Sequence, residues 1–145
     1  MDSGHLWLVY ALLSAIFAAL VAIFGKIGLQ GIDSTAATAI RSCIMAFFLI
    51  GVILAFGKTA DLAPIFSDNT AIKFIVLSGV AGALSWLFYF LALQSANVTQ
   101  IVPIDRMSVI FALVLAVLFL GEKVTLQVMA GSVLIVIGAI LVAMS

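Results

Sequence analysis

Five apolar segments, each long enough to cross a lipid bilayer, make up most of this 145-residue chain. A hydrocarbon core about 30 Å thick requires roughly 20 helical residues, and a segment of that length satisfies its backbone polar groups in lipid as a helix. The predicted helices cover about residues 6–29, 36–56, 71–94, 98–120 and 124–143. The sequence therefore predicts an all-α integral membrane protein, a single membrane domain over residues 1–145, with its termini on opposite sides.

Composition argues against a soluble domain and against most enzymes. Hydrophobic residues make up 66% of the chain and charged residues 8%, whereas soluble domains carry about 25% charged residues. The formal net charge is zero, so no basic surface predicts a nucleic-acid partner. His5 and Cys43 are the only residues of their types, which leaves no cluster with metal-ligand spacing, and no nucleophile or nucleotide-binding motif occurs. We therefore expect no enzymatic activity, no cofactor and no metal site.

The basic residues divide evenly between the two sides of the predicted bundle. The N-terminal side holds Lys58, Lys73 and Lys123, and the opposite side holds Lys26, Arg41 and Arg106. An excess of Lys and Arg on the cytoplasmic side normally sets the orientation of a membrane protein. A chain without such an excess has no strong reason to choose one orientation, and two oppositely inserted copies could supply both halves of an inverted-repeat transporter.

Three stretches of the chain resemble the EamA-type half of the drug/metabolite transporter superfamily. They are residues 85–94 (SWLFYFLALQ), 102–108 (VPIDRMS) and 119–125 (FLGEKVT). The resemblance covers essentially the whole chain as one five-helix unit, and the segment 98–120 with its Gly-Glu ending is the most specific part. Longer members carry two such units in one chain, in inverted orientation, whereas this chain resembles the single-unit members. The resemblance therefore implies half of an inverted-repeat ten-helix transporter that works as an antiparallel homodimer. It also implies transport of small metabolites in the cell (inner) membrane.

Charged residues inside the predicted spans are the first candidates for a solute site, because a charge at a helix centre costs roughly 2.5–3.5 kcal/mol on insertion scales. Arg41 and Asp105 lie about 7 Å and 10 Å inside their spans at 1.5 Å per residue. In one interpretation Arg41, Arg106 and Lys26 outweigh Asp105 in a cavity that attracts an anionic or zwitterionic, amino-acid-like solute, since an arginine fork matches a carboxylate. Alternatively, Lys26 and Arg41 snorkel to the headgroups, and Asp105 pairs structurally with Arg106.

Pro103 lies just before this charged pair, in the first turns of the segment 98–120. Proline removes one backbone hydrogen bond and can open a helix locally. We expect either a gating bend at Pro103 or a proline tolerated near a helix start.

A polar and aromatic face of the segment 71–94 supplies the remaining candidates. Ser85 and Tyr89 are four residues apart and share a helix face, while Trp86 lies near the midplane, too deep for the interfacial aromatic belt. We expect Ser85, Trp86 and Tyr89 to line the solute site. For Trp86, packing against neighbouring helices is the alternative.

Gly131 and Gly138 are seven residues apart in the last span, and small residues at that spacing suit a helix–helix seam, within the unit or across a dimer. The resemblance favours the dimer, so we predict a homodimer interface there. Two rival interpretations remain: a non-transporting membrane scaffold or accessory subunit, and one half of a heterodimeric transporter.

Overall fold

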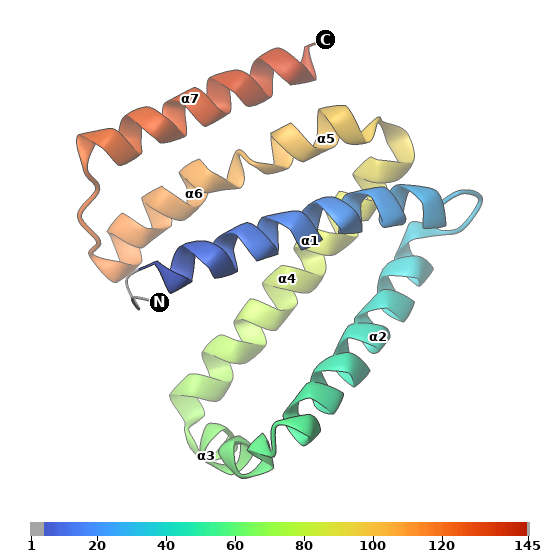
Figure 1. Ribbon diagram of the computed structural model, residues 1–145, viewed down its shortest axis with the longest axis vertical. Coiled ribbons are helices and arrows are strands. Elements are labelled where there is room, and N and C mark those ends of the chain that lie inside the picture. The colour runs from blue at the N-terminus through green and yellow to red at the C-terminus, as the bar shows by residue number, and fades with distance from the viewer. Residues whose placement is uncertain (1–4, 145) are drawn as a thin grey trace. The chain divides into compact units, whose positions relative to one another are not determined.

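The computed structural model describes residues 5–144, and all regular secondary structure in that range is helical (Figure 1). Five helical segments are long and apolar enough to cross a membrane, which confirms the predicted all-α, five-span class. The spans are α1 (Leu6–Gly28), α2 (Ser34–Ala55), α4 (Asn69–Ser95), the segment Val98–Leu120, and α7 (Leu126–Ala143). Two short elements, the 3₁₀-helix η1 (Lys58–Asp61) and α3 (Leu62–Ser67), connect α2 to α4.

Short-range chemistry sets the ends of the spans. The carboxylate of Asp33 accepts a hydrogen bond of 2.8 Å from the backbone N–H of Ala36 and caps α2. The hydroxyl of Thr125 caps α7 in the same way, through the N–H of Val128 at 3.3 Å. Gly121 ends the fourth span with φ of 66°, a left-handed conformation that glycine adopts without steric cost.

The fourth span is interrupted and divides into α5 (Val98–Asp105), α6 (Ser108–Leu115) and the π-helix η2 (Ala116–Leu120). At the α5–α6 junction the backbone hydrogen bonds join residues three apart and not four apart. The N–H of Met107 donates to the carbonyl of Ile104 at 2.9 Å, and the N–H of Ile110 donates to the carbonyl of Met107 at 3.0 Å. The turn lies at Arg106 and Met107, three and four residues beyond Pro103. Pro103 itself lies inside α5, and the backbone irregularity follows it.

The chain forms two compact units, and the first consists of α1 and the chain from Ser95 onward. Within it α7 packs most extensively along α5, and α1 also contacts α5. The Nζ atom of Lys26, in the last turn of α1, donates a hydrogen bond of 2.8 Å to the carbonyl of Ala96, just before α5. The buried apolar residues of this unit are Ala22, Ile101 and Ala139.

The second unit, Leu29–Gln94, is a pair of antiparallel helices, α2 and α4, joined at one end by η1 and α3 (Figure 1). At the opposite end the side-chain amide of Gln94 donates a hydrogen bond of 2.7 Å to the carbonyl of Ile32. Both ends of the pair are therefore fixed, one by the covalent connection and the other by this hydrogen bond.

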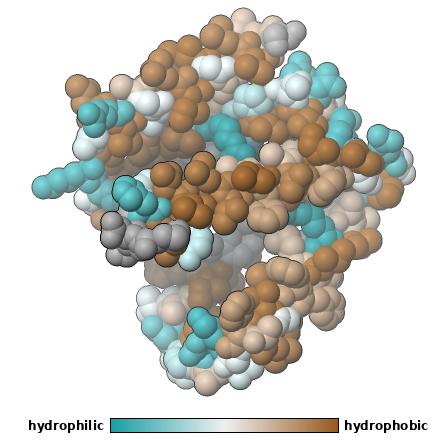
Figure 2. All heavy atoms as spheres, in the orientation of Figure 1, coloured by the Kyte–Doolittle hydropathy of each residue, from teal (hydrophilic) through white to brown (hydrophobic). Residues whose placement is uncertain are grey.

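Large apolar side chains are exposed along every span, including Phe47 at 75% and Phe119 at 81%. Figure 2 shows hydrophobic residues covering most of the visible face. Soluble monomers rarely expose apolar patches of more than a few hundred Å², and lipid-facing helices do so throughout. The exposed surface is that of a multi-pass membrane protein.

Candidate functional site

The guanidinium of Arg41 lies on the face of an aromatic ring inside the second unit. Its Cζ atom is 3.6 Å from the ring centroid of Trp86 and 5.3 Å from that of Phe90. Arg41 comes from α2, seven residues after its start at Ser34, which corresponds to a depth of about 10 Å at 1.5 Å per residue. The charged group is therefore held within the span, on α4, by a cation–π contact.

Three aromatic rings of α4 form the platform for this guanidinium. Trp86 meets Tyr89 edge to face at 5.5 Å and Phe90 edge to face at 5.9 Å, with interplanar angles of 80° and 83°. Such edge-to-face pairs fix ring orientation. Phe90 is buried, whereas Trp86 and Tyr89 are half-buried. We call Arg41, Trp86, Tyr89 and Phe90 the arginine–aromatic cluster.

One nitrogen of the guanidinium is left without a hydrogen bond. The Nη1 atom of Arg41 is buried and has no hydrogen-bond partner among the described residues. Arginine carries five N–H donors and no acceptor, and a buried charged donor without a partner is costly. The neighbouring hydroxyls of α2 are directed to their own helix: Thr38 donates to the carbonyl of Ser34 at 2.7 Å, and Ser42 donates to that of Thr38 at 2.8 Å. The cluster thus contains a buried charged donor that no described acceptor satisfies.

The structure brings together three of the predicted site residues and adds a fourth. Arg41, Trp86 and Tyr89 belong to the cluster. Ser85, the residue before Trp86, is exposed on α4. Phe90 was not predicted, although it lies four residues after Trp86 and therefore on the same helix face.

The other charged candidates belong to the first unit. Asp105 and Arg106 are exposed at the α5–α6 junction, and Pro103 is half-buried one turn earlier. The backbone N–H of Arg106 donates to the carbonyls of Val102 at 3.3 Å and Pro103 at 3.1 Å. These residues therefore lie at or next to the α5–α6 junction of the fourth span.

Gly131 and Gly138 face open space. A Cβ atom built on either glycine would meet nothing within 4 Å beyond its own helix turn. The close helix approach that such small residues permit is thus not used at these two positions within the described chain.

Comparison with known proteins agrees with this architecture. The model of a family described as the EamA-like transporter family matches residues 5–144. A protein of Sinorhizobium sp, named an uncharacterized transporter in the 3′ region of cobO, is 38% identical over 137 residues, which cover 94% of this chain and 96% of that protein. An uncharacterized protein of Methanocaldococcus jannaschii is 32% identical over 81 residues, 56% of this chain and 59% of its own length. No solved structure shows significant similarity to the chain.

Proposed function

Because the chain belongs to the EamA-like transporter family and carries five membrane-spanning helices, it is a multi-pass membrane transporter, and we propose that it moves small anionic or zwitterionic, amino-acid-like solutes. The proposed location is the cell (inner) membrane. The proposed mechanism is alternating access around a site near the membrane midplane, between two copies inserted in opposite orientations.

The observation that carries the proposal is the buried, unpartnered Nη1 of Arg41. A charge inside a span is rare and usually functional, and this one is held in place by the ring of Trp86 at 3.6 Å. A guanidinium so fixed loses little conformational freedom when it binds, and its planar fork matches a carboxylate. A charge-assisted hydrogen bond contributes about 1.5–3 kcal/mol, which corresponds to roughly 10–150-fold in solute affinity.

The aromatic rings suit the rest of such a solute. Trp86 and Tyr89 are half-buried, so part of each ring can contact an apolar group by packing or an ammonium group by a cation–π contact. Ser85 is exposed on the same helix and supplies a hydroxyl at the same level of the span. This combination favours a zwitterion with an apolar part over an inorganic anion.

A second copy completes the transporter in this proposal, because five helices are few for enclosing a cavity with two gates. The open faces at Gly131 and Gly138 support a homodimer seam on α7, where a helix can approach closely. The irregular α5–α6 junction supports a gating bend after Pro103, since a tightened helix segment often marks a hinge. Asp105 and Arg106, exposed at that junction, would contact the solute, and Asp105 would carry the proton if protons drive transport.

Uptake into liposomes tests the proposal. Purified protein would be reconstituted and screened with labelled amino acids and organic anions, and the best solute would be used for the variants. We expect Arg41→Ala and Asp105→Asn to abolish uptake while the helical circular dichroism spectrum is unchanged. Lys58→Ala is the matched control, because Lys58 is an exposed basic residue of η1, and it should retain full uptake.

Unchanged uptake in both site variants would remove the proposed site. The antiparallel pair is tested separately, by fusing a cytoplasm-active and a periplasm-active reporter in turn to Ser145. Activity of both reporters supports dual orientation. A signal from one side alone rules out the antiparallel homodimer and leaves a heterodimer or an accessory subunit.

A further inference from the structure

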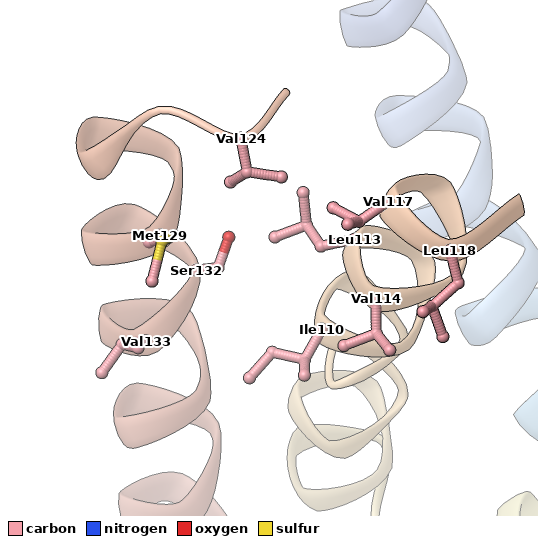
Figure 3. A pocket seen from close by; sticks show the side chains of 9 residues that line it. All are labelled: Ile110, Leu113, Val114, Val117, Leu118, Val124, Met129, Ser132 and Val133. Carbon is pink, nitrogen blue, oxygen red and sulfur yellow. The ribbon is translucent and has the colours of Figure 1, made fainter. Parts of the chain in front are cut away.

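An apolar groove of about 380 Å³ runs between α6 and η2 on one side and α7 on the other (Figure 3). Ile110 and Val114 line it from α6, Val117 from η2, and Met129 and Val133 from α7. All of these residues belong to membrane-spanning segments of the first unit. The groove therefore opens at membrane depth, with a volume in the range of ligand sites.

The side chains that line the groove offer a ligand no free hydrogen-bond donor. Its one polar lining side chain, Ser132, donates its hydroxyl hydrogen to the carbonyl of Val128 at 2.8 Å. Figure 3 shows Ser132 and Ile110 directed into the space between the two helices. Because every other lining residue is apolar, the groove favours an occupant that is apolar where it contacts the helices.

Backbone geometry produces the groove. α7 packs along α5 more extensively than along α6, and the turn that follows α6 is the π-helix Ala116–Leu120. A π-helix has one more residue in each hydrogen-bonded turn than an α-helix, and such segments are frequent at functional sites. The widened turn and the divergence from α7 leave the space between them.

One end of the groove reaches the loop that joins η2 to α7, where Val124 contributes to the lining. The two preceding residues, Glu122 and Lys123, are both exposed. They lie at a span end, the level at which lipid headgroups lie. The loop presents one negative and one positive charge side by side, which is complementary to a headgroup that also carries both signs.

A second copy of the chain is a poorer occupant than lipid. In an α-helix successive residues turn by about 100°, so Gly131 lies about 200° from both Met129 and Val133. The open glycine face, which the proposed homodimer uses, is therefore on the opposite side of α7 from the groove. Lipid tails are as apolar as leucine. A tail that fills the groove makes dispersion contacts with the lining side chains, which an empty groove lacks.

We propose that the α6–α7 groove binds one acyl chain of a zwitterionic aminophospholipid, whose phosphate is adjacent to Lys123 and whose ammonium is adjacent to Glu122. This site shares no residue with the arginine–aromatic cluster, and the proposal does not depend on which solute is transported.

Native mass spectrometry of delipidated protein, to which phosphatidylethanolamine and phosphatidylglycerol with the same acyl chains are added, tests the proposal. We expect phosphatidylethanolamine to be retained at least about tenfold better, a difference of about 1.4 kcal/mol. Val114→Trp and Val133→Trp, which fill the groove from opposite walls, should each lower retention of that lipid by a similar factor. Leu134→Trp is the control, because Leu134 is exposed on α7 and outside the groove lining. It should leave retention unchanged.

The headgroup and the occupant are tested separately. Neutralising both loop charges, by Glu122→Gln with Lys123→Gln, should remove the preference between the two lipids, since both are then held by the acyl chain alone. Equal retention of the two lipids by the unmodified chain, or full retention in both groove-filling variants, would overturn the proposal. A disulfide between copies at Val133→Cys, in a Cys43→Ala background, would also overturn it, because a protein helix would then occupy the groove.

Discussion

The contact between Arg41 and Trp86 makes a quantitative prediction about stability. Its Cζ-to-centroid distance of 3.6 Å is well inside the limit of about 6 Å for a cation–π interaction. For a desolvated pair this interaction contributes about 2 kcal/mol. Phe90, at 5.3 Å, remains when Trp86 is replaced and retains part of the attraction. We therefore expect a coupling free energy of about 1–2 kcal/mol between Arg41 and Trp86.

A double-mutant cycle isolates this coupling from the packing of the indole ring. Trp86→Leu removes the ring, and Arg41→Met removes the charge while keeping an apolar side chain of similar length. The loss of indole packing is common to both backgrounds and cancels in the cycle. Unfolding would be followed by circular dichroism during titration with sodium dodecyl sulfate in mixed micelles, and the four free energies of unfolding would be compared.

The expected result is that Trp86→Leu destabilises the chain more in the presence of Arg41 than in its absence. Interhelical hydrogen bonds in a membrane protein average about 0.6 kcal/mol in such cycles, so a coupling above 1 kcal/mol would identify a distinct charged contact. Trp7→Leu is the control, because Trp7 is 66% exposed near the start of α1, and it should show no coupling to Arg41. An equal cost of Trp86→Leu in both backgrounds would refute the reasoning.

Two further predictions concern α1 and α7. Lys26→Met removes the donor of the 2.8 Å hydrogen bond to the Ala96 carbonyl. Because that donor is charged, we expect the free energy of unfolding to fall by about 1.5–3 kcal/mol, measured from the thermal unfolding midpoint in detergent. An unchanged midpoint would contradict this prediction. Gly138→Ala should not destabilise the chain, because a Cβ there meets nothing within 4 Å, whereas Gly138→Trp should prevent close approach at the proposed homodimer seam. Light scattering after size-exclusion chromatography would distinguish monomer from dimer. A dimer that persists in Gly138→Trp would show that the dimer interface does not lie at Gly138.

The fold could be predicted from sequence because lipid leaves the backbone few choices. Span ends were less predictable because single polar side chains decide them. α2 starts at Ser34 and not at residue 36, since Asp33 caps it through the N–H of Ala36. α7 starts at Leu126, after its cap residue Thr125. In each case a side-chain acceptor satisfies a free backbone donor, a local effect that a hydropathy pattern does not contain.

The arginine–aromatic cluster illustrates a different limit. The sequence gives the depth of Arg41 in its span and places Trp86, Tyr89 and Phe90 on one face of α4, since they are spaced by three and four residues. It does not say which face of α4 lies against α2, because both helices are apolar around most of their circumference. Helix contacts in a membrane depend on shape and on individual polar groups, so the pairing of Arg41 with Trp86 required the structure.

The same contact changes how the basic residues bear on orientation. Charges count toward orientation when they lie in loops or near span ends, and Arg41 is instead held inside the span on Trp86, with Nη1 buried. Without Arg41 the even division becomes three basic residues on the N-terminal side against Lys26 and Arg106 on the other. An excess of one basic residue on the N-terminal side favours a cytoplasmic N-terminus. This excess is so small that one added basic residue on the other side would cancel it. The dual orientation that we propose would therefore depend on a difference of one basic residue, and Arg41, which binds solute in our proposal, would not contribute to that difference.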